Sequence, residues 1–315
     1  MPPERSIGAL FPSFAGLFAQ PSQNAYFCLM KLTEQLGEFG SRLGASIKSL
    51  AKVAVLGRRP TISRCPQAAE GRPLVILGNG PSLRALIDNK ADQLREATTM
   101  ALNFAANAEE FTLLKPDFYL LADPHFFEGR ETDPNVGKMF DRFNRLVDWP
   151  MTLYIPASQN AAKLGLTNPK IRIERFNFIG AEGFGWLEKM LYGAGLAMPR
   201  PRNVLVPALM TAILAGFRTI YLTGADHGWL STLGVTENNE VVNFQPHFYK
   251  DNDEEHSRVA SVYRNVRLHE VLLSFYLAFR SYHRVEAYAR ANGISIHNST
   301  PGSFIDAFRR SPLPF

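Results

Sequence analysis

Short apolar runs separated by longer mixed segments set the strongest constraint on how residues 73–315 can fold. Runs such as Leu74–Leu77 do not alternate apolar with polar residues, which is typical of strands buried on both faces of a sheet. Because helix-length segments separate the runs, the pattern predicts an α/β fold with a mostly parallel sheet and helices on both faces. The expected strands span residues 74–77, 98–102, 118–121, 151–155, 219–222 and 294–296, with weaker signals at 171–173 and 176–179.

The first 72 residues have a different pattern, in which apolar residues recur every three or four positions. This spacing predicts an amphipathic helix whose apolar face carries Leu29, Leu32, Leu36, Phe39, Leu43, Ile47 and Leu50. Basic residues gather near its carboxyl end, at Lys48, Lys52, Arg58 and Arg59. We expect this helix to pack on the main domain or on a second subunit, or alternatively to rest on anionic lipid. Residues 58–72 are expected to form a linker, which divides the chain into a lead-in (1–72) and a main domain (73–315).

The charge is distributed unevenly between these two regions. The 315-residue chain has a formal net charge of +5, and residues 1–72 alone hold nine Lys/Arg against four Asp/Glu. The main domain is therefore neutral overall, whereas a nucleic-acid-binding domain is expected to carry a basic face, so this class is excluded. The two cysteines, Cys28 and Cys65, form no CxxC pair. This usage predicts neither a zinc cluster nor a disulfide framework and favours a reducing, cytoplasmic location.

Between Gly224 and His256 the apolar residues are no longer regularly spaced, and glycines, asparagines and a charged cluster are frequent. An irregular connection of this length inside a domain is often a lid or a substrate-binding loop. We therefore expect a lid at about residues 227–256. A long helix is expected from Ser257 to about Asn292, where Gly293 ends it, and a shorter buried helix is expected at residues 204–215.

Polar residues follow several expected strands directly, at 79–82, 103, 123, 226–227 and 298–303. The carboxyl ends of parallel strands share one edge of a sheet, where ligands bind. Gly78 and Gly80 would let the backbone approach a ligand, and Ser82 could cap the next helix or leave neighbouring N–H groups for a phosphate. Asp123 and Asp226 could hold a ribose hydroxyl, coordinate Mg²⁺ or cap a helix. A plain tight turn remains the alternative for the glycine segment.

Two histidines are candidates for proton transfer. His256 is the first choice for a general base, because it closes the expected lid and precedes the long helix. A surface histidine in a charged loop is the alternative for His256, and His227 is the second choice for the base. The histidine spacing matches no zinc motif, and no GxSxG sequence occurs.

The segment Leu77-Gly78-Asn79-Gly80-Pro81-Ser82-Leu83 resembles the opening motif of the bacterial sialyltransferase family. It is also similar to a broader group of polysaccharide-biosynthesis proteins and motility accessory factors, which is related in fold to an archaeal hydroxymethylpterin diphosphokinase. Residues 117–124, 212–227 and 298–304 extend the likeness, and Asp251-Asn252 with His256-Ser257 resemble the family's lid. The resemblance covers about residues 73–310.

The sialyltransferase resemblance implies a Rossmann-like domain of GT-A type, a CMP-activated acidic sugar and inversion without a metal cofactor. It implies that His256 deprotonates the acceptor and that nucleotide is bound at the strand ends, for which we predict Gly78, Asn79, Gly80, Pro81, Ser82, Asn103, Asp123, Asp226 and Ser303. The family stabilises the departing phosphate with tyrosines just after the Asp226 position, and this chain has none there. His227, Trp229, Arg202 or Tyr249 would have to replace them.

The first functional hypothesis is a glycosyltransferase of bacterial lipopolysaccharide or capsule assembly that transfers a sialic-acid-like or Kdo-like sugar from CMP to a glycan or glycolipid. The second is a diphosphokinase with Mg²⁺ on Asp123 and Asp226. The third is a nucleotide-binding subunit without catalysis in a glycan-assembly complex. In each case we expect a cytoplasmic protein, peripheral at the inner membrane if the lead-in binds anionic lipid, and a homo-oligomer is compatible with all three.

Overall fold

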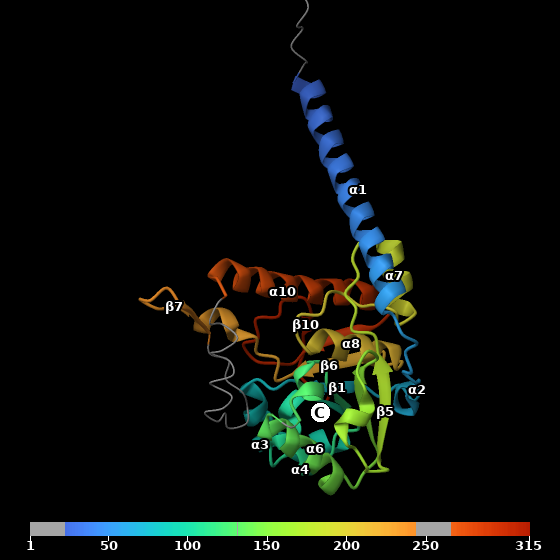
Figure 1. The fold of residues 1–315 in the computed structure, drawn as a ribbon, viewed down its shortest axis with the longest axis vertical. Helices are drawn as coiled ribbons and strands as arrows, with labels where there is room; N and C mark the ends of the chain where they lie inside the picture. Colours follow the sequence, from blue (N-terminus) through green and yellow to red (C-terminus); the bar gives the residue numbers. More distant parts are fainter. Residues whose placement is uncertain (1–22, 131, 244–265) are drawn as a thin grey trace, which may run out of the picture.

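A central parallel sheet organises the chain in the computed structural model, which describes residues 23–130, 132–243 and 266–315 (Figure 1). The strand order is β10-β9-β6-β1-β2-β3-β4-β5, and every neighbouring pair in this sheet is parallel. The strands are β1 Leu74–Leu77, β2 Thr98–Leu102, β3 Phe118–Leu120, β4 Met151–Pro156, β5 Ile171–Phe176, β6 Thr219–Thr223, β9 Ser295–Asn298 and β10 Arg309–Arg310. The predicted α/β fold is confirmed.

Side chains that alternate along each strand bury the sheet on both faces. Leu74 and Ile76 pack in one core with helices α7 (Gly185–Gly193), α8 (Leu205–Leu214) and α10 (Leu268–Ala291). Val75 and Leu77 face the other side, beneath α3 (Ser82–Glu96). Farther along that second face, α6 (Pro134–Leu146) packs on side chains of β3 and β4. The apolar runs therefore lack alternation because helices cover both faces.

At the sheet edge, the two weaker strand signals belong to one strand, β5, and residues 177–179 lie beyond its end. Arg172 and Glu174 interrupt the apolar pattern of this edge strand, where the buried Glu174 pairs with Arg172 at 2.8 Å and accepts from Ser63 N at 3.0 Å. The expected linker runs along this strand: Thr61 N donates to Arg175 O at 3.0 Å, and α2 (Pro66–Ala69) follows. Residues 58–72 therefore form specific contacts, and the division into two domains stays a prediction.

The lead-in forms one long helix, α1 (Gln23–Leu56), which projects from the sheet and its covering helices, here called the body (Figure 1). Its carboxyl half packs on the body, mainly through polar contacts. Ser49 Oγ donates to Glu182 O at 2.7 Å and accepts from Glu182 N at 2.9 Å, and Phe184 N donates to Ser46 Oγ at 3.0 Å. Val53 packs against the main core, but most of the large apolar side chains of α1 are exposed, so the apolar face is largely left uncovered.

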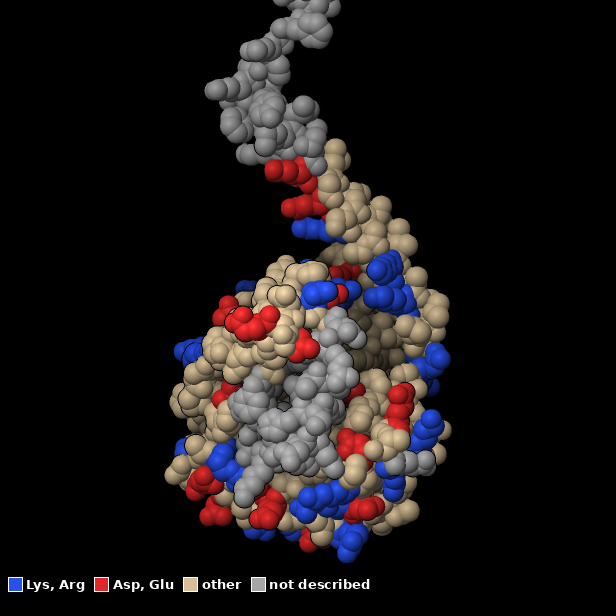
Figure 2. Space-filling view, turned by 60° about the vertical axis from the view of Figure 1, so that its left-hand side comes forward, with Lys and Arg blue, Asp and Glu red and all other residues tan. Residues whose placement is uncertain are grey.

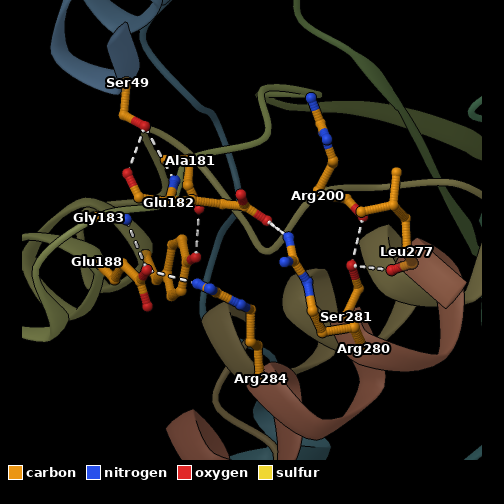
Figure 3. Close-up of polar contacts among 11 residues, drawn as sticks. Ser49, Ala181, Glu182, Gly183, Glu188, Arg200, Leu277, Arg280, Ser281 and Arg284 are labelled. Carbon is orange, nitrogen blue, oxygen red and sulfur yellow. Dashed lines mark hydrogen bonds and ion pairs between the residues drawn. The ribbon is translucent and has the colours of Figure 1, made fainter. Parts of the chain in front are cut away.

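The contact point of α1 is tied to two other helices through ion pairs (Figure 3). The Glu182 carboxylate pairs with Arg280 of α10, while its backbone holds Ser49. Glu188 of α7 pairs with Arg284 at 2.5 Å. The carboxyl half of α1 is therefore attached to α7 and α10 through Glu182.

The expected lid is partly ordered where the structure describes it. Gly228–Thr232 form a short 3-10 helix, and β7 (Leu233–Val235) pairs with β8 (Val241–Asn243) as an antiparallel hairpin. The expectation of an irregular connection is wrong here, because Val241 packs against Val271 and Phe275 and thereby holds the hairpin on α10. The rest of the lid and the start of the expected helix at Ser257 lie outside the described residues, and α10 begins at Leu268.

Within the described ranges, no helix is both long enough and apolar enough to cross a bilayer.

Candidate functional site

The order in which strands are added to the sheet reverses between β1 and β6. From β1 the chain adds β2, β3, β4 and β5 on one side, and β6 then pairs with the opposite edge of β1. The helices that follow these two strands, α3 and α10, cover opposite faces of the sheet, and such a switch point is where open α/β sheets bind ligands. A cavity of about 700 Å³ lies here, within the range of small-molecule sites. Its lining includes eight predicted residues: Gly78, Asn79, Gly80, Pro81, Asn103, Asp123, Asp226 and His227.

The floor of the cavity is a close contact between two backbone turns. A Cβ on Gly78 would lie 2.4 Å from Gly224 O, and one on Gly80 would lie 2.0 Å from Asp226 Oδ2. Gly78 N also donates to Thr223 O at 2.7 Å, and Gly80 N to Gly224 O at 2.8 Å. Glycine is therefore required at both positions to bring the turns after β1 and β6 together.

Asp226 caps helix α3, which was one of the three roles that the sequence analysis considered for this residue. Its Oδ1 accepts from Ser82 N at 3.2 Å and its Oδ2 from Ser82 Oγ at 2.8 Å. The carboxylate thus occupies the positive end of the helix, where a phosphate was one expectation for this motif. Ser82 is turned toward Asp226 and is not part of the cavity lining. A phosphate in this cavity would be repelled from the start of α3.

Two asparagines place unpartnered amide oxygens at the cavity. Asn79 Nδ2 donates to Leu102 O at 3.1 Å, but its Oδ1 is buried and has no hydrogen-bond partner among the residues that the structure describes. Asn103 Oδ1 is also buried and unpartnered, and this residue adopts a φ of 50°, in the left-handed region. Tyr119 Oη donates to Asn103 O and holds that turn. Because buried acceptors without partners are costly, the pair is suited to a ligand that donates hydrogen bonds.

Asp123 and His125 form the neighbouring wall. Asp123 is exposed, and its Oδ1 accepts from His125 N at 2.9 Å at the start of α5 (His125–Glu128). His125 Nε2 lies 2.7 Å from Asp133 Oδ2, and the other oxygen of Asp133 caps α6 through Asn135 N. The sequence analysis missed this carboxylate-paired imidazole, because the eight-residue separation of His125 and Asp133 matches no motif.

His227 lies in an aromatic environment beside the cavity. Its Nε2 is 2.6 Å from Tyr282 Oη, which accepts from Asn203 Nδ2 at 2.7 Å. Trp229 packs on the imidazole with ring centroids 4.1 Å apart. Burial lowers the pKa of His227 to about 3, so the ring is neutral at physiological pH. The Tyr282 hydroxyl has one proton to donate, and of its two hydrogen-bond partners among the described residues Asn203 Nδ2 is a donor; we therefore assign the hydroxyl proton to Nε2 and the imidazole proton to Nδ1.

This arrangement changes the chemistry expected of His227. A ring with so low a pKa and with Nε2 occupied is a poor general base, which corrects the second choice made from sequence. It is instead a neutral hydrogen-bond donor through Nδ1–H. Asn203 and Tyr282 were not predicted, since Tyr282 comes from α10, 55 residues farther along the chain.

Arg202 contributes positive charge to the same side of the cavity. Its side chain is exposed, and it makes no ion pair within the described part of the chain. Aromatic rings complete the lining, from Phe104, Phe126 and Phe178. The cavity thus has amide acceptors on its β1–β2 side and a guanidinium with a neutral imidazole on the other.

The loop after β9 supports the cavity from behind. Ser303 Oγ donates to Ala225 O at 2.6 Å and accepts from Asn298 Nδ2 at 3.0 Å. Thr300 Oγ1 accepts from Ala225 N at 3.0 Å. The Ser303 hydroxyl is buried in these bonds and outside the cavity lining, which Gly302 reaches instead. Ser303 therefore positions the turn after β6, a correction to its expected place beside a nucleotide.

Other sequence candidates are not placed. His256 and Tyr249 lie outside the described residues, so the predicted base has no structural position. Among the residues that are described, no group of three or more His, Cys, Asp or Glu side chains is arranged to hold a metal ion.

Comparison with known proteins gives one structural neighbour to report. No protein-family model matches the sequence, and no curated protein matches it either. A solved structure, a MAf glycosyltransferase from Magnetospirillum magneticum AMB-1, is similar with a TM-score of 0.47 and 13% sequence identity. The match covers 81% of this chain but only 35% of that one, so this chain spans about a third of its length. We therefore infer function from the geometry of the site.

Proposed function

We propose that this protein is a glycosyltransferase that uses the cavity at the β1–β6 switch point to bind a nucleotide-activated sugar. The observation that carries the proposal is the polarity of the cavity. Two buried, unpartnered amide oxygens, from Asn79 and Asn103, face a side that holds Arg202 and the neutral His227. A nucleotide has the complementary polarity, with hydrogen-bond donors at its nucleoside end and negative charge at its phosphate.

The nucleoside end belongs on the β1–β2 side. Asn79 Oδ1 and Asn103 Oδ1 accept from ribose hydroxyls or from an exocyclic amino group, which satisfies two otherwise unpaired buried acceptors. Phe104 and Phe126 add apolar surface beside them. Cytosine carries such an amino group and uracil does not, which favours CMP over UDP for the donor, in agreement with the resemblance of residues 77–83 to the sialyltransferase motif.

The phosphate end belongs on the Arg202 side, because Asp226 already caps α3 and repels anions there. Arg202 supplies charge, and His227 Nδ1–H supplies a donor whose position is fixed through Tyr282 and Asn203. Oriented donors of this kind stabilise a phosphate that gains charge as the sugar departs. They would perform the role of the tyrosines that are missing after Asp226.

For a CMP-linked ulosonic acid of the sialic-acid or Kdo type, the transfer step balances without an added redox reactant. An acceptor hydroxyl on a surface glycan or glycolipid loses its proton to a base, and its oxygen bonds to the anomeric carbon with inversion. The bond from that carbon to the phosphate oxygen breaks, and CMP leaves with the electron pair. We assign the base to His256, from the resemblance and its place at the end of the lid.

The His125–Asp133 pair is the alternative base. The carboxylate 2.7 Å from Nε2 orients this imidazole, which is the arrangement that activates histidine in hydrolytic triads. His256→Ala and His125→Ala separate the two assignments. We expect His256→Ala to abolish transfer while CMP still binds, and His125→Ala to retain transfer; the reverse pattern would assign the base to His125.

Thermal shift with CMP, UDP, GDP and ATP, with Mg²⁺ and with EDTA, tests the proposed function. A ligand that binds only the folded chain raises its melting temperature by mass action. We expect CMP to give the largest shift, unchanged by EDTA, and Arg202→Gln to reduce it. A shift produced only by Mg-ATP would contradict the proposal and support the diphosphokinase hypothesis. CMP binding without turnover of any CMP-sugar would support a non-catalytic subunit instead.

A further inference from the structure

We propose that the apolar face of α1 is an interface with a second copy of this chain. We define the α1 stripe as Leu36, Phe39, Leu43, Ile47 and Leu50, whose exposed fractions range from 43% to 62%. Figure 2 shows tan surface, without Lys, Arg, Asp or Glu, on one side of the described stretch of the projecting helix. Five large apolar side chains exposed in a row are unusual on a monomer and mark an interaction surface.

The spacing of the α1 stripe is that of a helix-to-helix contact. Its members follow one another at steps of three, four, four and three residues. Farther toward the amino terminus the sequence continues the pattern, so that leucines 29, 36, 43 and 50 are separated by seven residues. A repeat of this length keeps one apolar edge facing a partner helix over several turns.

The helix also lacks the packing that would stabilise it in a single copy. Its described body contacts include Ser46, Ser49 and Val53 in its carboxyl half, while Phe39 of the stripe packs on Phe184, with ring centroids 5.4 Å apart. Glycines at 37, 40 and 44 have nothing within 4 Å of where a Cβ would lie, and each costs an exposed helix up to about 1 kcal/mol. Since helices gain most of their stability from burying an apolar face, α1 requires a partner.

A second copy is the occupant that best fits the charge and size of the stripe. The charged residues of this part of α1, such as Glu34, Glu38, Lys48 and Lys52, project from the side opposite the stripe, by their spacing. Two stripes can therefore meet without opposing charges of like sign. An anionic membrane would instead require a polar face rich in Lys and Arg, whereas residues 34–56 combine two acids with three bases.

The projecting stretch of α1 is long enough for a helix-to-helix contact. Leucines 29 to 50 span 22 residues, which is roughly 33 Å of helix, and packed helices lie about 8–10 Å apart. The same face on both subunits gives a self-complementary, two-fold contact, which is the commonest form of homodimer. Because Ser49 and Glu182 attach α1 to the body, the contact would also fix the relative orientation of the two bodies.

Sedimentation equilibrium of the full-length chain at about 10 μM tests the proposal. We expect the wild-type chain to be a dimer. The triple variant Leu36→Gln, Leu43→Gln, Ile47→Gln should be a monomer with an unchanged body melting temperature, because these side chains are exposed. The matched variant Lys48→Gln, Lys52→Gln changes the opposite side of the helix and should remain a dimer.

Three outcomes would overturn the proposal: a monomeric wild-type chain, a triple variant that remains dimeric, or a lysine variant that dissociates. Flotation with vesicles of anionic phospholipid tests whether a membrane surface, rather than a second copy, covers the α1 stripe. A monomeric wild-type chain that floats with these vesicles, and ceases to do so in the triple variant, would show that the stripe rests on lipid. Nucleotide binding is measured in parallel and is expected to be equal in all three proteins, so failure of the dimer leaves the proposed function intact.

Discussion

Asn103 illustrates how one side chain is shaped for a ligand. It directly follows β2, its φ of 50° is one that few residues other than glycine and asparagine adopt, and its carbonyl oxygen accepts from Tyr119. Asn103 lines the cavity, and its Oδ1 is buried without a hydrogen-bond partner among the described residues. Strain combined with an unmet acceptor at a strand end indicates a binding position rather than a structural one.

Replacing Asn103 with glycine isolates the amide, because glycine keeps the backbone conformation. We expect Asn103→Gly to weaken CMP binding about tenfold, or roughly 1.4 kcal/mol, in titration calorimetry. The control is Asn107→Ala, since Asn107 Oδ1 is also buried and unpartnered but lies outside the cavity lining. Equal affinity of Asn103→Gly and the wild type would remove Asn103 from the nucleotide site.

His227 makes the stability of the fold depend on pH. Burial lowers its pKa to about 3, whereas an unfolded histidine titrates near 6.5. Between these values the unfolded chain binds a proton that the folded chain does not, so stability falls as the pH falls from about 6.5 toward 3. From pH 7 to pH 5, we expect the free energy of unfolding of the wild type to drop by about 2 kcal/mol more than that of His227→Asn.

Urea unfolding at the two pH values measures this difference. Asparagine suits the left-handed φ of 54° at this position, which makes it the mildest replacement. An identical drop in both proteins would show that His227 is not held neutral by its surroundings.

Single residues were predictable from sequence where the chemistry is local. The motif at 78–82 and the polar residues after β2, β3 and β6 are found because strand ends of a parallel sheet share an edge. Asn203, Tyr282 and the pairing of His125 with Asp133 were missed, because these contacts join separate elements. For both Ser82 and Asp226, capping of a helix was one of several roles that the sequence left open. The structure shows that the Asp226 carboxylate accepts from Ser82 N and, at 2.8 Å, from Ser82 Oγ at the start of α3.

At the scale of elements, the approach of the β1 and β6 turns determines where the cavity forms. Gly78 is the tightest point of backbone contact, with Gly224 O and its carbonyl carbon 2.4 and 2.7 Å from where a Cβ would lie. We expect Gly78→Ala to lower the free energy of unfolding by about 1–3 kcal/mol in urea titration, because the turns must separate.

Gly37→Ala provides the control for that measurement, since nothing lies within 4 Å of its Cβ position on α1. It is expected to leave the stability of the body unchanged and to favour the helix. Equal stability of Gly78→Ala and the wild type would mean that the two turns are not in contact.

The attachment of α1 depends on one serine. Ser49 exchanges two hydrogen bonds with the Glu182 backbone and is only 4% exposed. In Ser49→Ala the backbone N–H and C=O of Glu182 lose this partner, and we expect backbone amides in residues 46–56 to exchange at least tenfold faster with deuterium. Ser41→Ala, on an exposed part of the same helix, should not change the rates; similar rates in both variants would argue against this attachment.

Elements were predicted well where burial is two-sided and less well at the periphery. Strands β1 to β4 and β6 follow their apolar runs closely, and α8 matches the buried helix expected at residues 204–215. The edge strand β5 gave two weak signals because it is buried unevenly. The β7–β8 hairpin was missed because its residues pair across a turn at Asn239 and depend on α10 for burial.

At the scale of the whole molecule, the charge is distributed unevenly between the body and the first 72 residues. The body is neutral overall and contains the cavity, while the basic excess lies within residues 1–72. Sequence showed this division and the amphipathic character of the lead-in. It did not show which face of α1 meets the body, because two serines among larger apolar residues gave no signal of a buried contact.

The most direct test of the account is release of CMP from a CMP-activated ulosonic acid by the full-length chain in the presence of EDTA. We predict release above the uncatalysed rate, stimulated by a glycan acceptor and reduced at least tenfold by Arg202→Gln, because the proposal assigns Arg202 to the departing phosphate. No release from any CMP-activated sugar, or release that Arg202→Gln leaves unchanged, would contradict the assignment of this cavity as a glycosyltransferase active site.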